Sequence, residues 1–302
     1  MPAFKYSLSF LMFSAISTFA AAENSAQSLI ETACKDISNK LSSVHHQQCL
    51  DNQLTDSGYR SNLNKPLLIK EYPPLAPRKP QAKVLLIGGI HGDEYSSVSI
   101  LFKWLNTLDK YHSGLFHWQV IPLLNPDGLL RPHSRRTNGN GVDLNRNFSP
   151  GENSQASLEY WEKRTWKDKR RYPGPAPLSE PETQWLNHLI TDFEPDVIIA
   201  VHAPFGILDF DGPHKAPKHL GSLHLKLLGT YPGSLGNYAG IQLGKPVITI
   251  ELPYAGIMPS TQQISTIWTD LVRWLKKNAS QAKKNKKLLQ AEIDNKKLSD
   301  VD

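Results

Sequence analysis

The sequence contains only two cysteines among 302 residues, and it has neither an internal repeat nor a polar linker near its middle. The missing linker argues against two domains, because domain boundaries normally fall in such segments. With 39% hydrophobic and 21% charged residues, the composition is ordinary for a soluble globular protein. We therefore expect one large domain with a sizeable core.

The apolar stretch near the N-terminus, Leu8 to Phe19, is too short to span a bilayer comfortably, which takes about 20 residues. It follows Lys5 and ends in three alanines, an arrangement typical of a cleavable secretory signal. We expect residues 1–22 to be that signal. Cleavage after Ala22 would leave an exported, periplasmic protein with no transmembrane segment. A membrane anchor or a buried helix is the alternative interpretation.

The two cysteines, Cys34 and Cys49, lie shortly after the expected cleavage site. In an oxidising compartment they can pair and restrain the N-terminal segment. Pairing depends on a geometry that the sequence does not give. Neither cysteine lies beside an obvious base, so we do not expect catalysis by a thiol.

Much of the formal net charge of +6 comes from lysine pairs near the C-terminus. We assign residues 276–302 to a basic tail, because such runs are usually solvated helix faces or frayed ends. Attraction to polyanions, such as cell-wall polymers or acidic lipid, is the alternative. No aromatic residues alternate with these lysines, so we expect no nucleic-acid partner.

Continuous apolar runs predict four buried strands, and helical spacing predicts three helices around them. The strands are expected at 84–90, 120–124, 197–201 and 246–250, and the helices at 96–108, 181–193 and 261–277. This alternation predicts the α/β class, as a single doubly wound domain with a mixed, mostly parallel central sheet flanked by helices. We place that domain at residues 65–275 and treat residues 23–64 as an N-terminal segment.

Polar residues directly follow three of the expected strands. His91 and Glu94 come after the first, His202 after the third and Glu251 after the fourth. Because α/β proteins bind ligands at the carboxyl ends of their strands, we expect these side chains to converge. Zn²⁺ favours imidazole and carboxylate ligands, and a catalytic site uses three of them and leaves a position for water. Alone, the His-x-x-Glu pair is equally compatible with a surface loop before a helix.

A glycine-rich loop downstream carries two arginines. Residues 136–148 read Arg-Thr-Asn-Gly-Asn-Gly-Val-Asp-Leu-Asn-Arg-Asn-Phe, and arginine is suited to binding a carboxylate or stabilising an oxyanion. The other motifs, in chain order with this loop, are His-Gly-Asp-Glu at 91–94, Asn-Pro-Asp-Gly at 125–128, His202, and Ile-Glu-Leu at 250–252. On these residues the chain resembles the zinc carboxypeptidase A family over about residues 65–275. It looks most similar to the bacterial murein peptide amidase branch of that family.

The resemblance implies that His91, Glu94 and His202 hold one Zn²⁺ ion. It also implies that Glu251 acts as general base and general acid. Asp143 matches an acid that orients the first histidine, as carboxylates commonly do for zinc-bound imidazoles.

The substrate-facing residues follow from the same resemblance. Arg136 matches the arginine that polarises the scissile carbonyl, and Asn145 and Arg146 match the pair that binds a substrate carboxylate. The family's mobile tyrosine has no clear counterpart, because neither Tyr231 nor Tyr238 aligns with it by spacing.

The expected function is an exported zinc-dependent peptidase or amidase that hydrolyses short murein peptides at the γ-D-glutamyl–meso-diaminopimelate bond. A general metallocarboxypeptidase and an acyl-amino-acid amidase are alternatives with the same chemistry. A non-catalytic wall-peptide binder is the alternative from another class. Asp209 and Asp211 remain open between recognition of a substrate ammonium group and a simple turn.

Overall fold

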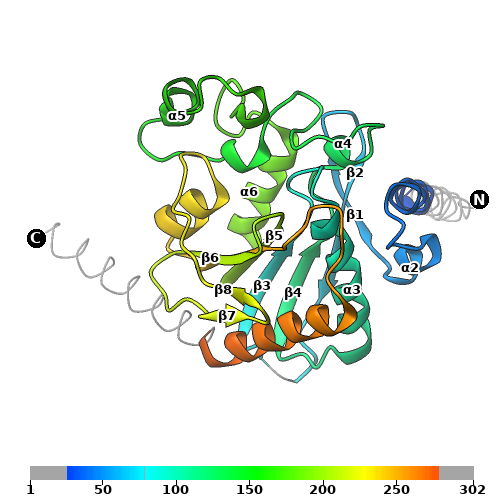
Figure 1. Ribbon diagram of the computed structural model, residues 1–302. Coiled ribbons are helices and arrows are strands. Elements are labelled where there is room, and N and C mark those ends of the chain that lie inside the picture. The colour runs from blue at the N-terminus through cyan, green and yellow to red at the C-terminus, as the bar shows by residue number, and fades with distance from the viewer. Residues whose placement is uncertain (1–25, 78, 279–302) are drawn as a thin grey trace, which may run out of the picture.

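The computed structural model describes residues 26–77 and 79–278 of the chain. The signal expected at residues 1–22 lies outside these residues, as do residues 279–302 of the expected basic tail. A mixed seven-stranded sheet forms the centre of the described part, with helices on both of its faces (Figure 1).

The sheet has the strand order β1-β2-β4-β3-β5-β9-β6. Its strands are β1 (Thr55–Arg60), β2 (Pro66–Tyr72), β3 (Ala82–Ile87), β4 (Phe116–Ile121), β5 (Val197–His202), β6 (Ile207–Asp211) and β9 (Val247–Glu251). The four central strands, β4, β3, β5 and β9, run parallel, and the strands outside them pair antiparallel. Two short strands, β7 (His219–Leu220) and β8 (Leu223–His224), form a separate ribbon.

The helices divide between two cores that the sheet separates. They are a helix at 26–40, α2 (His46–Asp51), α3 (Tyr95–Tyr111), α4 (Pro126–Leu129), η1 (Leu144–Arg146), α5 (Ala156–Arg164), η2 (Lys169–Arg171), α6 (Pro181–Phe193), η3 (Gly236–Gln242) and a helix at 261–278. Residues of α3, the 261–278 helix and the N-terminal helices share one core. Residues of α6 and η3 share the other. In β3, Val84 and Leu86 face the first core, whereas Leu85 and Ile87 face the second.

The expected fold class is confirmed, with shifted strand ends. The first strand stops at Ile87 rather than at residue 90, and Gly89 beyond it turns with φ +61°. The second strand occupies 116–121 instead of 120–124, because its first residues alternate between buried and half-buried positions. The antiparallel strands β1, β2 and β6 were not expected. They contain polar or half-exposed positions, so they lack the continuous apolar signal of the central strands.

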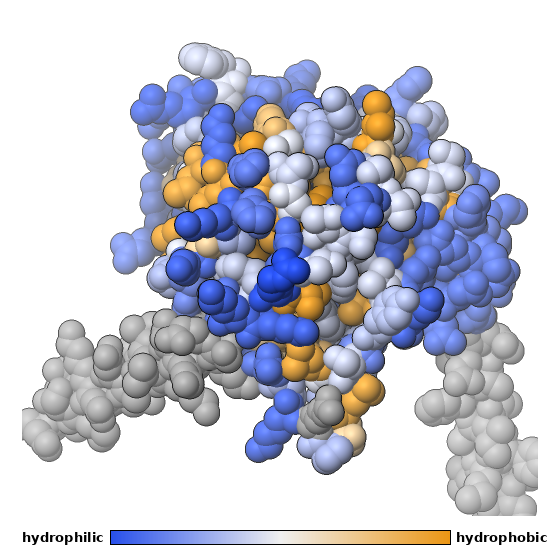
Figure 2. Space-filling view, turned by 60° about the horizontal axis from the view of Figure 1, so that its bottom comes forward, coloured by the Kyte–Doolittle hydropathy of each residue, from blue (hydrophilic) through white to orange (hydrophobic). Residues whose placement is uncertain are grey.

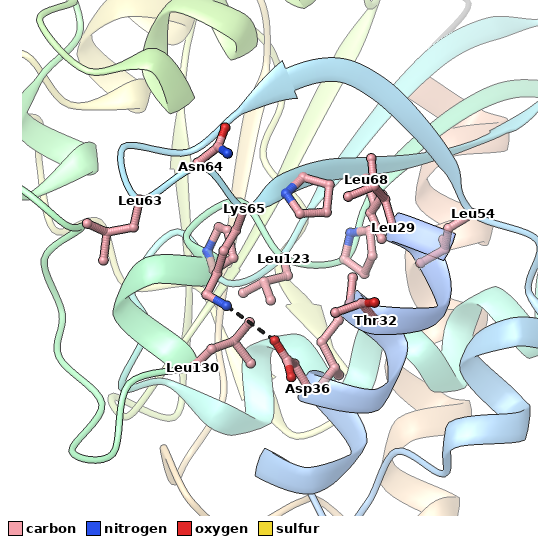
Figure 3. Close-up of a pocket in the computed structure, with 15 residues that line it drawn as sticks. Leu29, Thr32, Asp36, Leu54, Leu63, Asn64, Lys65, Leu68, Leu123 and Leu130 are labelled. Carbon is pink, nitrogen blue, oxygen red and sulfur yellow. Dashed lines mark hydrogen bonds and ion pairs between the residues drawn. The ribbon is translucent and has the colours of Figure 1, made fainter. Parts of the chain in front are cut away.

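The described part of the expected N-terminal segment, residues 26–64, packs into the domain, and the boundary expected at residue 65 falls between the paired strands β1 and β2. Ile37 of the helix at 26–40 and Leu54 belong to the core shared with α3. A cavity of about 270 Å³ lies where this helix meets β2 and α4 (Figure 3). Leucines line it, and Lys65 forms an ion pair with Asp36 there at 3.2 Å.

A disulfide joins Cys34 of the 26–40 helix to Cys49 of α2, across a sequence separation of 15 residues. Cross-linking a loop of this length restricts the unfolded chain and stabilises the fold by about 3 kcal/mol. We therefore expect Cys34→Ala/Cys49→Ala to lower the free energy of unfolding by that amount. Urea unfolding of the variant and of the oxidised protein measures the difference. Coincident unfolding curves would contradict this role of the disulfide.

Among the described residues, no helix is both long and apolar enough to cross a bilayer. The face turned forward in Figure 2 carries mostly hydrophilic and intermediate side chains, with hydrophobic residues in separate patches.

Candidate metal centre and active site

The side chains expected to converge come from loops and strand ends at one edge of the sheet. His91 lies in the loop after β3, and Glu94 immediately precedes α3. His202 is the last residue of β5 and pairs in register with Glu251, the last residue of β9. Parallel strands thus bring together groups that are far apart in sequence.

Gly92 allows the loop that carries His91 to approach the turn at α4. A Cβ atom at this position would lie 2.2 Å from the backbone carbon of Gly128, so only glycine fits. Asn125 fixes the same contact, because its amide donates hydrogen bonds to the carbonyls of Ile90 and Arg136. The two loops that carry His91 and Arg136 are therefore held against each other.

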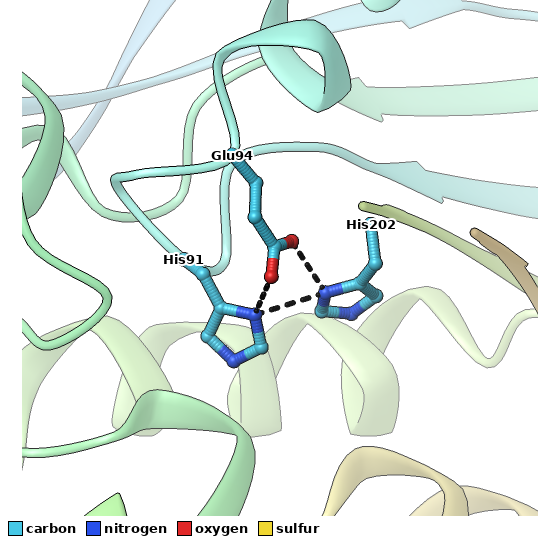
Figure 4. Close-up of side chains that lie close together, drawn as sticks. All are labelled: His91, Glu94 and His202. Atoms are coloured by element: carbon cyan, nitrogen blue, oxygen red, sulfur yellow. Dashed lines mark hydrogen bonds and ion pairs between the residues drawn. The ribbon is translucent and has the colours of Figure 1, made fainter. Parts of the chain in front are cut away.

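His91, Glu94 and His202 form one compact, buried group (Figure 4). The Nδ1 atom of His91 lies 2.8 Å from Oε1 of Glu94 and 3.1 Å from Nδ1 of His202. The His202 Nδ1 atom lies 3.0 Å from Oε2 of Glu94. Among the described residues, this is the one group of three or more potential ligands that is close enough to share a metal ion.

The donor set fits a divalent cation such as Zn²⁺. The Nε2 atom of His91 lies 3.1 Å from Oδ1 of the fully buried Asp143, and a carboxylate at this nitrogen together with the Arg136 donor at Nδ1 favours the tautomer with its proton on Nε2. The Nδ1 atom then carries a lone pair and faces the Glu94 carboxylate and the second imidazole. Two imidazole nitrogens and one carboxylate are the ligands that catalytic zinc uses, and a carboxylate behind the histidine is a common support.

Asp143 also orients Arg136. The Nε atom of Arg136 donates to Oδ2 of Asp143 at 2.8 Å, and its Nη1 atom lies 3.1 Å from Nδ1 of His91. Burial disfavours a charge on Asp143, but Arg136 and His91 outweigh it and hold the pKa of this carboxyl well below its usual range. The carboxylate therefore stays ionised and fixes both the imidazole and the guanidinium.

Glu251 faces the same group from β9. Only 7% of its surface is exposed, and its Oε2 atom is buried without a hydrogen-bond partner among the described residues. Burial raises the pKa of this carboxyl. An unpartnered, partly desolvated carboxylate beside a metal site is suited to accept and return a proton.

A cavity of about 410 Å³ opens next to these groups. Asn145 and Arg146 line it, and the Arg146 guanidinium lies 4.4 Å from the centre of the Tyr231 ring. The Asn145 side chain accepts the Leu235 N–H at 2.8 Å, which ties this wall to the segment at 233–236. Ser234, Leu235 and Gly236 line the cavity, whereas Tyr238 packs on Phe148 in the core.

The acidic residues left open by the sequence also line this cavity. Asp209 and Asp211 point to the cavity side of β6, while Leu208 and Phe210, which alternate with them along the strand, face the core. Asp209 accepts the Leu228 N–H at 3.0 Å, but neither carboxylate has a cationic partner among the described residues. Burial, reinforced by Asp209, raises the pKa of Asp211 to about 6.

The structure brings all the sequence-derived candidates to this cavity or, for Asp143, directly behind it. Sequence reasoning missed Arg170 and Arg171, which line the cavity from η2. The only sequence signal for these residues was the basic run at 167–171, which resembles an ordinary surface turn. Tyr231 was considered and left unassigned, yet it lines the cavity.

Residues 65–204 match a family described as zinc carboxypeptidase. Murein peptide amidase A of Escherichia coli (strain K12) is 32% identical over 227 residues, which are 73% of this chain and 90% of that protein. The crystal structure of a murein-tripeptide amidase from Escherichia coli O157 has a TM-score of 0.50 and 30% identity, over 70% of this chain and 86% of that chain. Carboxypeptidase A from Helicoverpa armigera shares the fold with a TM-score of 0.56 at 17% identity, over 75% of this chain and 68% of its own. The chain therefore belongs to the zinc carboxypeptidase family and is a zinc-dependent metallopeptidase.

Proposed function

We propose that this metallopeptidase is exported to the periplasm and hydrolyses short murein peptides at the γ-D-glutamyl–meso-diaminopimelate bond. The observation that carries this proposal is the mixed charge of the cavity beside Glu251. Arg146 on one wall suits a carboxylate, and Asp209 and Asp211 on another wall suit an ammonium group. The similarity to the murein peptide amidase of Escherichia coli supports the same substrate class.

In this proposal His91, Glu94 and His202 hold the zinc ion. Zinc in such a site supplies an electrophilic centre and lowers the pKa of water toward about 7. Asp143 keeps the proton of His91 on Nε2, so that Nδ1 remains a ligand atom.

The remaining steps belong to side chains of the chain itself. Glu251 takes a proton from the attacking water and returns it to the nitrogen of the leaving amine. Arg136, held by Asp143, stabilises the negative charge that develops on the scissile carbonyl oxygen. Asn145 and Arg146 bind the carboxylate next to the leaving nitrogen and so fix the register of the substrate.

The acid pair explains why diaminopimelate is the favoured leaving half. Its side chain ends in a second amino acid centre, which carries an ammonium group. Asp209 and Asp211 are partly desolvated and have no cationic partner among the described residues, so a bound ammonium would relieve their mutual repulsion. A cavity for ordinary apolar C-terminal residues has no use for two such carboxylates.

Export is supported by the Cys34–Cys49 disulfide, because disulfides persist in oxidising compartments such as the periplasm. The apolar stretch from Leu8 to Phe19 provides the corresponding signal at the level of sequence. Fractionation of expressing cells tests this proposal, and recovery of the full-length chain in the cytoplasm would contradict it.

The substrate is tested by incubating the zinc-loaded protein with L-alanyl-γ-D-glutamyl-meso-diaminopimelate and identifying the products by mass. We expect free diaminopimelate and the dipeptide L-alanyl-D-glutamate. Parallel reactions contain ordinary L-peptides and N-acyl amino acids. Release of C-terminal residues from the L-peptides alone indicates a general carboxypeptidase, and hydrolysis of N-acyl amino acids alone indicates an acyl-amino-acid amidase. Binding of the tripeptide without any product would favour the wall-peptide binder.

The role of the acid pair leads to a prediction for Asp211→Asn. One charge-assisted hydrogen bond to the substrate ammonium is worth about 1.5–3 kcal/mol, so kcat/KM for the tripeptide should fall by roughly 10- to 100-fold. A matched tripeptide ending in 2-aminopimelate lacks the distal ammonium group, so the substitution should change kcat/KM for this peptide little. Equal losses for both peptides would reject ammonium recognition.

The same pair predicts a pH dependence. Because the pKa of Asp211 is raised to about 6, its carboxylate is charged above this pH and becomes neutral as the pH falls through it. The wild-type preference for the diaminopimelate peptide over the 2-aminopimelate peptide should therefore decline below about pH 6. The ratio of the two kcat/KM values measured across pH 5–8 reports this change, because groups that act on both substrates cancel.

A further inference from the structure

A second cavity, of about 570 Å³, adjoins the active site and is strongly basic. We define it as the basic cleft. Its lining consists of the cationic side chains Arg135, Arg136, Lys169 and Arg170, together with Thr137, Asn140, Gly141, Trp161 and Tyr172. Among the described residues, no acidic side chain lines it. Of the residues that line it, only Arg136 takes part in the catalytic steps.

The basic cleft and the active-site cavity share a wall. Arg136 and Arg170 line both of them, whereas Arg135 and Lys169 line only the cleft. Arg170 is also paired with Asp93, whose Oδ2 atom lies 2.5 Å from Nη1. Arg136 and Arg170 therefore lie at the boundary between the two cavities.

The cleft is built into the frame of the active site. The Trp161 and Tyr172 rings lie 4.9 Å apart, and the Trp161 N–H donates to the Asp168 carbonyl at 2.7 Å. The Tyr172 carbonyl accepts the backbone N–H of Asp143 at 2.7 Å. One wall of the cleft is thus attached directly to the residue that orients His91 and Arg136, so the cleft is preorganised relative to the reacting groups.

The proposed roles of the active-site residues place the acyl half of the substrate next to the cleft. Asn145 and Arg146 hold the leaving half in the active-site cavity, and Arg136 contacts the scissile carbonyl, which belongs to the acyl half. In the proposed orientation the acyl half lies on the other side of the scissile bond from the leaving half, and it begins at the carbonyl beside Arg136. The cavity beyond Arg136 is the basic cleft.

We propose that the basic cleft is a subsite for a free carboxylate on the acyl half of the substrate, bound by Arg135 and Lys169. Neither side chain has an ion-pair partner among the described residues, so both are free to bind an anion. This inference rests on the proposed function in its choice of acyl group. A γ-linked glutamyl residue keeps its α-carboxylate on a short alkyl chain from the scissile carbonyl, whereas an ordinary α-linked residue uses that carboxylate in the peptide bond.

The cleft therefore favours an acyl group that carries a free carboxylate, as a γ-linked glutamyl residue does. Each charge-assisted contact from an exposed side chain contributes only a modest binding free energy. Together, the two contacts should raise kcat/KM for an anionic acyl group by about 10-fold. Because Arg135 and Lys169 are exposed, added salt should weaken this preference.

The test compares two tripeptides that differ at one group. One is L-alanyl-γ-D-glutamyl-meso-diaminopimelate, and the other carries a carboxamide in place of the glutamyl α-carboxylate. For the wild type we expect kcat/KM to be about 10-fold higher for the carboxylate peptide. In Arg135→Gln/Lys169→Gln the two values should agree within about twofold, with the carboxamide peptide cleaved as by the wild type.

Lys163→Gln is the matched control, because Lys163 lies on the same helix as Trp161 but forms an exposed pair with Glu159 outside the cleft. It should keep the full preference for the carboxylate. A wild-type enzyme that cleaves both peptides equally, or a double variant that retains the preference, overturns the inference.

Failure of the proposed function gives a different result. An enzyme that cleaves neither tripeptide but removes C-terminal residues from L-peptides disproves the murein substrate. The preference of the cleft for a carboxylate is then tested by comparing the cleavage rates of N-acyl peptides that carry Glu or Gln on the acyl side of the scissile bond. A preference for Glu that the double variant loses sustains the carboxylate subsite, and equal rates reject it.

Discussion

Replacing Glu251 by glutamine should lower kcat by roughly 10³-fold, because the amide cannot take the proton from water or return it to the leaving amine. The substitution keeps the size of the side chain, which is buried at the end of β9. Zinc content and substrate affinity should remain close to those of the wild type, since Glu251 is not one of the three ligands. A non-catalytic binder has no need for this carboxylate.

The measurement combines single-turnover rates, zinc analysis and equilibrium binding of the tripeptide. Glu152→Gln, at an exposed position, provides the matched control and should behave as the wild type. Activity of Glu251→Gln equal to that of the wild type would show that another group acts as the base.

The second large effect is expected for Arg136→Gln. Loss of one donor to a developing oxyanion typically costs 10²- to 10³-fold in kcat, and we expect a decrease of about 10²-fold or more. Asp143 also loses its Arg136 partner, so the zinc content of the variant must be measured together with its rate. Arg164→Gln in α5 removes a positive charge outside both cavities and serves as the control.

An unchanged rate for Arg136→Gln would reject its role at the carbonyl. A rate that falls only in proportion to zinc occupancy would show that Arg136 acts through Asp143 and His91 instead. A full complement of zinc with a large loss of kcat is the result that the proposed mechanism requires.

The central sheet could be predicted because its parallel strands are buried on both faces. Val197 to Val201, for example, form a continuous apolar run that needs no other interpretation. Strands β1 and β2 gave no comparable signal, because they lie at one side of the sheet, β1 has no buried residue, and most positions of β2 are half-buried or exposed. Their membership in the sheet depends on tertiary pairing, which a local pattern does not contain.

The metal site could be predicted for a related reason. His202 and Glu251 directly end buried parallel strands, and parallel strands place their carboxyl ends side by side. The role of Asp209 and Asp211 was harder to predict, because Asp-Gly at 211–212 also indicates a turn. Their alternation with Leu208 and Phe210 was the available sign of a strand with one polar face.

The basic cleft was not foreseeable from the sequence. Arg135 and Lys169 are separated in the chain by η1, α5 and the loops around them, and each is an ordinary exposed basic residue by itself. The segments that carry Arg135 and Lys169 are brought together by two contacts. The Trp161 ring packs on the Tyr172 ring, and the Asp143 backbone N–H donates a hydrogen bond to the Tyr172 carbonyl. Such loop-to-loop contacts leave no periodic pattern in a single sequence.

The central claim is that His91, Glu94 and His202 together bind one zinc ion. The most direct measurement is the zinc content of protein reconstituted with Zn²⁺ and then freed of excess metal by gel filtration. We expect one zinc ion per chain in the wild type and in Glu251→Gln, and a loss of nearly all bound zinc in His202→Ala. Retention of a full equivalent of zinc by folded His202→Ala, or absence of zinc from the wild type, would contradict the account.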